Sequence, residues 1–207
     1  TQAKDSPGMQ LVKTEAAQGA PLQFSWGSVI GTQVLYNSDK ENIKLSGDAA
    51  KTDLRMVAQA ANGLTVERVY SFSNDSYLIG MTVKVKNGSG ASVQGLPQMH
   101  LVNKHFLGVD SPAESFLFAG PAAFVNGNLE EKAAGKFKDG PLTLTGTIDW
   151  AGYEGNYFLC GLVPLEGSGI SFSMQGNNDL TKMVLAGNLD TLQPGTEKEY
   201  KYQVFYG

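Results

Sequence analysis

The sequence predicts an all-β protein with two large antiparallel sheets packed face to face. The 207 residues include 25 glycines and only 17% charged residues, a composition that favours strands joined by turns over helices. Apolar and polar residues alternate over many short stretches, which is the period of a half-buried strand. Turn-forming residues separate these stretches, so we expect roughly fourteen to seventeen short strands in one domain, without a repeat of fixed period.

The N-terminal quarter carries weak strand signals. Residues 1–8 are polar and end in Pro7-Gly8, so they predict a disordered lead-in or linker. Short strands are predicted at 9–15, 22–26, 33–36 and 43–46, with a break at 18–21 and a turn at 37–39. The polar residues 47–53 predict a loop.

The clearest signal is a long antiparallel hairpin between residues 54 and 86. A strand at 54–60 ends in Asn62-Gly63, the dipeptide that best tolerates positive φ in a tight turn. From Leu64 to Phe72 the even positions are apolar, although Arg68 and Val69 each break the rule once. A polar turn at 74–76 leads into a second alternating strand at 77–86. This pattern predicts one buried face and one wet face.

The second half predicts further strands. These are 96–107, which contains both histidines, then 114–119 and 122–125, hinged at Gly120-Pro121, and later 169–175, 182–186 and 199–206. Residues 129–138 are marked as helix or coil, because charges dominate and Gly135 weakens a helix. Residues 142–150 alternate as one half-buried strand, whereas 157–163 is almost wholly apolar and predicts a strand covered on both faces.

Composition excludes some functions. The net charge is −4 and no Lys/Arg cluster is visible, which argues against a nucleic-acid partner. The sequence contains no run of about 18 apolar residues, the length needed to cross a membrane as a helix, and no signal peptide is visible. The single cysteine, Cys160, lies in the apolar run, where a small core residue is expected.

The sequence assigns no catalytic, cofactor-binding or metal-binding residue. His100 and His105 are five positions apart, on opposite faces of a strand, and no ligand cluster accompanies them, so we expect structural histidines. The carboxylates group as Asp110 with Glu114, Glu130 with Glu131, and Asp149 with Glu154, which predicts solvated loops. Paired acids of a glycosidase are the alternative. No Gly-x-Ser-x-Gly elbow occurs, and Gly88-Ser-Gly90 fits a turn better than a phosphate loop.

The strand aromatics are expected mostly in the core, while a minority lining a groove for a peptide or sugar is the alternative. They are Tyr70, Phe72, Tyr77, Trp150, Tyr157, Phe158, Tyr200, Tyr202 and Tyr206.

Several stretches match one known family in order. The run from Gly63 to Ile79, with its Ser-Tyr-Leu-Ile after a polar turn, and the run from Met81 to Ser89 resemble the large periplasmic domain of the YidC family of bacterial membrane protein insertases. Further agreement comes from Trp150, Tyr157-Phe158 and Pro164, from Phe118 to Pro121, and from the final Tyr202 to Gly207. The resemblance covers residues 11–207; each motif is weak alone, but their order is specific.

The resemblance implies a β-supersandwich similar to galactose mutarotases. It implies that residues 1–8 are a linker from a preceding transmembrane helix, and that 9–207 form one periplasmic domain at the bacterial inner membrane. This domain would be noncatalytic and without cofactors, and accessory to insertion through contacts with Sec translocon components, nascent membrane proteins or chaperones. The resemblance assigns no binding residue. A carbohydrate-binding or mutarotase-like sugar-processing protein is the alternative, and a secreted adhesin-like module is a third.

Overall fold

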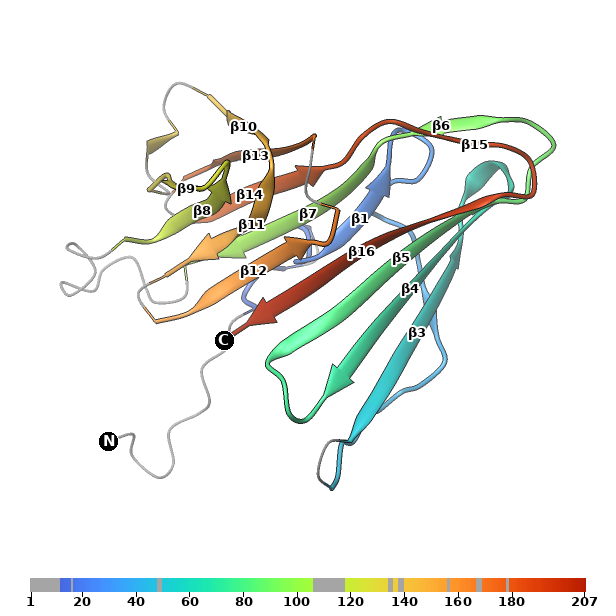
Figure 1. The fold of residues 1–207 in the computed structure, drawn as a ribbon, viewed down its shortest axis with the longest axis horizontal. Helices are drawn as coiled ribbons and strands as arrows, with labels where there is room; N and C mark the ends of the chain where they lie inside the picture. Colours follow the sequence, from blue (N-terminus) through green and yellow to red (C-terminus); the bar gives the residue numbers. More distant parts are fainter. Residues whose placement is uncertain are drawn as a thin grey trace.

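The structure is a computed structural model that describes residues 12–15, 17–47, 50–105, 118–133, 136–137, 140–155, 157–166, 169–177 and 179–207. Within these residues the fold contains sixteen strands and no α-helix. The strands form sheets of nine, five and two strands in which every pairing is antiparallel, which confirms the predicted fold class (Figure 1). No described helix is long and apolar enough to span a membrane.

The larger sheet has nine strands. Their order across the sheet is β2 (Asn37–Ser38), β3 (Lys51–Gln59), β4 (Leu64–Ser73), β5 (Leu78–Asn87), β16 (Glu197–Tyr206), β12 (Leu159–Pro164), β11 (Ile148–Glu154), β8 (Gly120–Val125) and β9 (Asn128–Glu131). The C-terminal strand β16 thus lies between the hairpin β4–β5 and the later strands, and it joins the two halves of the sheet.

The smaller sheet has five strands, and a two-stranded ribbon extends beyond it. The five strands are β1 (Gln23–Trp26), β7 (Pro97–Lys104), β14 (Leu180–Ala186), β13 (Ile170–Gly176) and β10 (Leu142–Gly146), in that order. The ribbon pairs β15 (Asp190–Leu192) with β6 (Val93–Gly95).

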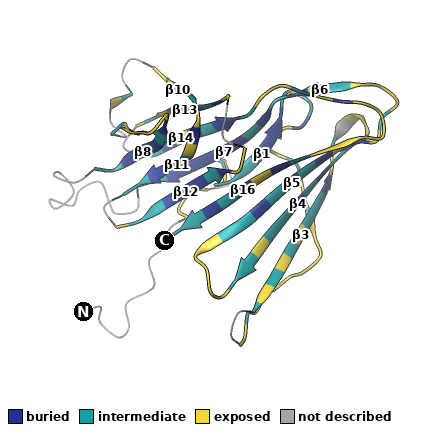
Figure 2. Ribbon diagram, in the orientation of Figure 1, coloured by how far each residue is buried: buried dark blue, intermediate teal, exposed yellow. Residues whose placement is uncertain are grey.

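The core lies between the two layers. Fully buried Leu101 and Phe172 of the smaller sheet belong to the same hydrophobic cluster as Val83 and Leu162 of the larger sheet. Figure 2 shows this burial concentrated where the layers overlap, while β3 carries exposed residues. The predicted two-layer packing is therefore present, and the far strands of the larger sheet extend to one side of it (Figure 1).

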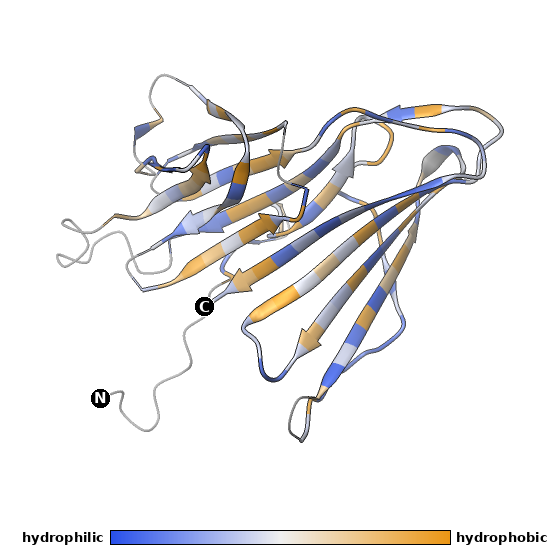
Figure 3. Ribbon diagram, viewed as in Figure 1, coloured by the Kyte–Doolittle hydropathy of each residue, from blue (hydrophilic) through white to orange (hydrophobic). Residues whose placement is uncertain are grey.

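The predicted hairpin is confirmed. Asn62 and Gly63 have φ values of 62° and 76°, as a tight turn between antiparallel strands requires, and the backbone of Asn62 within the short segment Ala61–Gly63 is not helical. Hydrophobic and hydrophilic residues alternate along β3 and β4 in Figure 3. The loop predicted at 47–53 is wrong from Lys51 onward, because β3 begins there and Lys51 pairs with Ser73.

The single strand predicted at 142–150 is wrong, because the chain changes sheets within it. β10 ends at Gly146 in the smaller sheet and β11 begins at Ile148 in the larger one. Gly146 has φ 140°, and a Cβ there would collide with the Asn126 side chain. Asn126 Oδ1 also accepts a 2.9 Å hydrogen bond from Thr147 N. The predicted strands are present on each side of this crossing, but the crossing itself has only a glycine as its sequence signal.

The helix or coil predicted at 129–138 is wrong at its start, since β9 occupies Asn128–Glu131. β9 pairs with β8 across Asn126-Gly127, whose φ values are 52° and 82°. This is the same Asn-Gly turn chemistry that marks the first hairpin. Gly120-Pro121 opens β8 and is not a hinge between two strands.

Some short strands were over-predicted. No strand forms at 12–15, 33–36, 43–46 or 118–119. Instead, Asn37 and Ser38, predicted as a turn, pair with Val57 and Met56 at the edge of the larger sheet. The predicted residues 1–11, 106–107 and 114–117 lie outside the described residues.

Candidate functional site

A cavity of about 210 Å³ lies between the two sheets, beside the start of β16 and the end of β12. We call it the interlayer pocket. Four apolar residues from both layers line it: Pro97, Pro164, Ile170 and Leu185. Pro97 and Leu185 belong to neighbouring strands of the smaller sheet, and Pro164 ends β12 opposite Tyr202 of β16. The rigid frame of two sheets therefore holds this apolar surface in place.

A chain of hydrogen bonds joins the buried Trp26 to two polar residues that line the pocket, Tyr200 and Asp190. Trp26 Nε1 donates to Tyr200 Oη over 2.8 Å, and Tyr200 Oη donates to Asp190 Oδ2 over 2.9 Å. Lys198 Nζ lies 3.7 Å from Asp190 Oδ1. The Tyr200 hydroxyl is thus already bonded on both sides, so it fixes the pocket wall more than it offers a free group to a ligand.

Burial governs the protonation of the pocket tyrosines. It raises the pKa of Tyr200 far above its usual value, and the Asp190 carboxylate raises it further against the opposing effect of the Trp26 donor. Burial also raises the pKa of Tyr202, with Glu166 adding to the effect. Both phenols therefore stay neutral over the physiological pH range, and neither can serve as a base.

The mouth of the pocket carries charges of both signs. Glu166 is exposed, and the side chains of Lys198 and Lys201 are 44% and 54% exposed. Two exposed leucines flank this mouth in the chain: Leu165 lies between the lining residues Pro164 and Glu166, and Leu189 lies between Asn188 and Asp190. The opening is therefore charged, and exposed leucines adjoin its lining residues in the chain.

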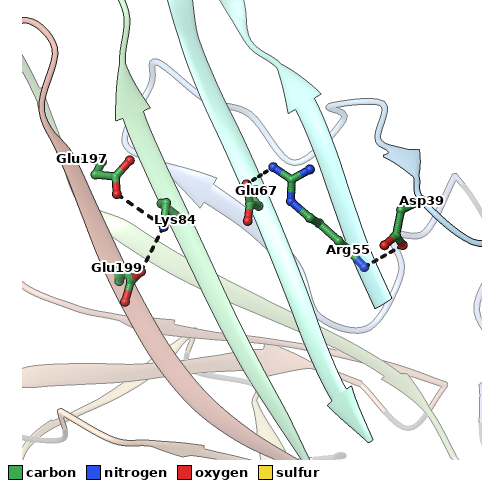
Figure 4. A network of polar contacts seen from close by, with 6 residues as sticks. All are labelled: Asp39, Arg55, Glu67, Lys84, Glu197 and Glu199. Atoms are coloured by element: carbon green, nitrogen blue, oxygen red, sulfur yellow. Dashed lines mark hydrogen bonds and ion pairs between the residues drawn. The ribbon is translucent and has the colours of Figure 1, made fainter. Parts of the chain in front are cut away.

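The outer face of the larger sheet carries a network of paired charges (Figure 4). Arg55 Nη2 lies 2.5 Å from Glu67 Oε2, and Lys84 Nζ lies 3.3 Å from Glu197 Oε1 and 3.2 Å from Glu199 Oε1. The pairing lowers the pKa of Glu67 and Glu199 and raises that of Lys84. A shallow cavity of about 300 Å³ opens among these residues, but its charges largely satisfy each other, which is typical of a solvated sheet face.

The histidines lie away from the interlayer pocket. His100 Nε2 is 2.8 Å from Ser25 Oγ on the neighbouring strand, and burial lowers its pKa. The His105 ring packs edge-on against Tyr153, with centroids 6.3 Å apart. Neither is among the described pocket residues, and no group of three metal-binding side chains forms among the described residues.

The predicted carboxylate groups do not converge on the pocket either. Glu130 and Glu131 are exposed on β9, and Asp149 is exposed on β11. Burial raises the pKa of Glu154, with a smaller contribution from Glu131. Asp110 and Glu114 lie outside the described residues.

The aromatics divide into three groups. Tyr200 and Tyr202 are buried as predicted and also line the pocket. Tyr77 and Tyr157 are 87% and 74% exposed, which contradicts a core position. The half-buried remainder comprises Tyr70, Phe72, Trp150, Phe158 and Tyr206. Sequence reasoning missed Asp190 and Lys198 as pocket residues and Trp26 as the hydrogen-bond partner of Tyr200, because no local spacing links positions that meet only in the folded state.

Cys160 is fully buried in β12, as predicted. Burial raises its pKa from 9.0 to about 11, so the thiol is protonated at neutral pH.

The raised pKa of the Cys160 thiol in the folded state makes stability depend on pH. Its stabilising contribution is fully present below pH 9.0 and is lost as the pH rises through about 11. Raising the pH from 8 to 10 should therefore lower the free energy of unfolding of the parent by about 1.4 kcal/mol more than that of Cys160→Ala. Urea unfolding at both pH values measures this, and equal losses in the two proteins would contradict it.

Comparison with known proteins gives one family. A model described as the YidC periplasmic domain matches residues 1–207. A protein of Syntrophus aciditrophicus (strain SB), named membrane protein insertase YidC, is 23% identical over 211 residues, covering 100% of this chain and 38% of that protein. The chain therefore spans less than two fifths of the length of this relative.

Solved structures share the fold at low identity. The α-galactosidase of Lactobacillus brevis is 10% identical, with a TM-score of 0.57 over 98% of this chain and 29% of that chain. A galactose mutarotase related enzyme of Lactobacillus acidophilus is 10% identical, with a TM-score of 0.52 over 83% of this chain and 71% of that chain. These likenesses confirm the predicted mutarotase-like fold.

Proposed function

The chain belongs to the family of YidC periplasmic domains, and from this membership we propose that it is a noncatalytic domain accessory to the insertion and folding of inner-membrane proteins. The observation that carries the proposal is the family match along residues 1–207. We assign residues 1–8 as a linker from a preceding transmembrane helix and 9–207 as one domain on the periplasmic side of the bacterial inner membrane.

The chemistry of the pocket supports a noncatalytic role. Its central hydroxyl is bonded to both Trp26 and Asp190, and its tyrosines stay neutral. The thiol of Cys160 is buried and protonated, so it is a poor nucleophile. Function then depends on contacts, and we propose Sec translocon components and nascent membrane proteins as the partners.

Removal of the domain tests the accessory role. In cells depleted of their own insertase, the full-length protein and a version with residues 9–207 replaced by a flexible linker would be compared for growth and for insertion of a reporter membrane protein. We expect insertion to continue at a reduced rate or with a narrower range of substrates, because the domain assists insertion. Complete loss of insertion, with the shortened protein present at normal level, would contradict an accessory role.

Photocrosslinking tests the proposed contacts. A photoreactive amino acid would replace Leu35 or Tyr77, which are 89% and 87% exposed, or the exposed Leu189, which lies between the pocket residues Asn188 and Asp190. We expect at least one site to crosslink to a Sec component or to an arrested nascent membrane protein. Failure at all three sites, with matched protein levels, would count against these partners.

Carbohydrate binding is a second candidate, favoured by the shared fold of two sugar enzymes and by the acid and tyrosines of the pocket. Titration with D-galactose and D-glucose checks this candidate by calorimetry and NMR. Heat or shift changes that disappear in Asp190→Asn would favour it over the protein-contact role.

A further inference from the structure

We propose that the interlayer pocket binds one aliphatic side chain of an extended polypeptide segment from a partner protein. This inference rests on the proposed function, since it names the part of the domain through which a protein contact is made.

The size suits a side chain. The cavity measures about 210 Å³, below the roughly 300–1,000 Å³ of pockets that enclose a drug-sized ligand. Pro97 and Pro164 stiffen two sides, and a Cβ on Gly187 would lie 2.9 Å from Pro97 Cγ. The walls are therefore close-set, and the space suits one or two side chains better than an oligosaccharide.

The floor favours an apolar occupant. Ile170 and Leu185 offer only methyl groups, Gly187 N already donates to Pro97 O over 2.9 Å, and Tyr200 Oη is bonded on both sides. A sugar would leave hydroxyl groups unpaired against this floor, which costs free energy. An aliphatic group needs no hydrogen bond and gains from leaving water.

The mouth favours a polypeptide around that side chain. Glu166 can accept from backbone N–H groups, and Lys198 and Lys201 can donate to carbonyl oxygens. Leu165 and Leu189 are 54% and 64% exposed, and each lies between two lining residues in the chain, so exposed apolar groups are close to the opening in sequence. Exposed apolar groups with a polar rim are typical of protein interaction sites.

Peptide titration of the ¹⁵N-labelled 207-residue chain tests the proposal. The probe is the blocked heptapeptide Ac-SGTLTGS-amide, with Ac-SGTATGS-amide as its match. The Trp26 indole N–H reports on the pocket because it donates to Tyr200, and Trp150→Phe identifies its signal. We expect a shift that saturates with a Kd on the order of 1 mM, and binding about tenfold weaker for the alanine peptide.

Two asparagine variants locate the site. Asn188→Phe places a ring at the mouth from an exposed lining residue and should abolish the shift. Asn42→Phe adds the same ring at an exposed residue before β3 and should leave it unchanged. Leu189→Ser, at an exposed position where folding is not at risk, should weaken binding a few fold.

Three results would overturn the proposal: no shift with the leucine peptide at about 5 mM, a shift that persists in Asn188→Phe, or a shift with D-galactose and none with the peptide. Crosslinks from Leu35 or Tyr77 to a partner protein do not depend on the pocket, so they would still be observed after any of these three results. The failure of peptide binding at the pocket is therefore distinguishable from the failure of the proposed function.

Discussion

Trp26→Ala is expected to destabilise the domain by about 3–5 kcal/mol, the range for large aromatic deletions in cores. Trp26 is 0% exposed and belongs to the main hydrophobic cluster. Its ring lies against the Cα face of Gly95, where no Cβ fits. Its indole N–H also holds the Tyr200 hydroxyl over 2.8 Å. The substitution would leave a large cavity and remove one of the two partners of Tyr200.

Urea unfolding followed by circular dichroism measures this loss. Trp26→Phe retains most of the ring and loses the N–H donor, so we expect a smaller loss of about 1–2 kcal/mol. Leu35→Ala, at a residue that is 89% exposed, is the control and should stay within about 0.5 kcal/mol of the parent. A Trp26→Ala midpoint equal to that of Leu35→Ala would show that the packing of β1 against Gly95 is wrong.

Local patterns predicted the elements whose information is local. The alternation from Leu64 onward and the Asn62-Gly63 turn gave the central hairpin nearly residue by residue, because each strand buries one face and the turn needs positive φ. The sidedness of Tyr200, Tyr202 and Val204 likewise survived in β16. These predictions required no knowledge of which strands pair.

The interlayer pocket could not be predicted in this way. Trp26 and Tyr200 are separated by 174 positions, and Asp190 reaches Tyr200 from a separate two-stranded ribbon. Periodicity describes which face of a strand is buried, but it carries no information on which residues of other strands meet that face. The change of sheet at Gly146 escaped for the same reason, since the alternation continues on both sides of it.

Arg68 is the most informative exception to the alternation. It follows Leu64 and Val66 on the inner face of β4, where a charge breaks the apolar pattern, yet it is only 7% exposed. Its guanidinium donates to Leu22 O and lies 5.4 Å and 5.7 Å from the ring centroids of Tyr36 and Tyr70. Within the described residues Arg68 forms no carboxylate ion pair, and its Nε has no hydrogen-bond partner.

Two opposing effects decide what Arg68 contributes. Burying a cation without a carboxylate costs free energy, whereas contact with two aromatic faces contributes about 0.5–2 kcal/mol each. The bond to Leu22 O adds about 1.5–3 kcal/mol and also ties the residue just before β1 to the larger sheet. Because the long stem packs as well, we expect the favourable contacts to exceed the cost of burial.

Arg68→Ala is therefore expected to lower the free energy of unfolding by about 3 kcal/mol, since it empties the space between the tyrosines and orphans the Leu22 carbonyl. Arg68→Met fills the space without a donor or a charge, so we expect a loss of about 1–2 kcal/mol. Urea unfolding of the two variants separates the effects. If Arg68→Met were as stable as the parent, the cost of burying the charge would cancel the aromatic and carbonyl contacts, and Arg68 would contribute to stability only by filling space.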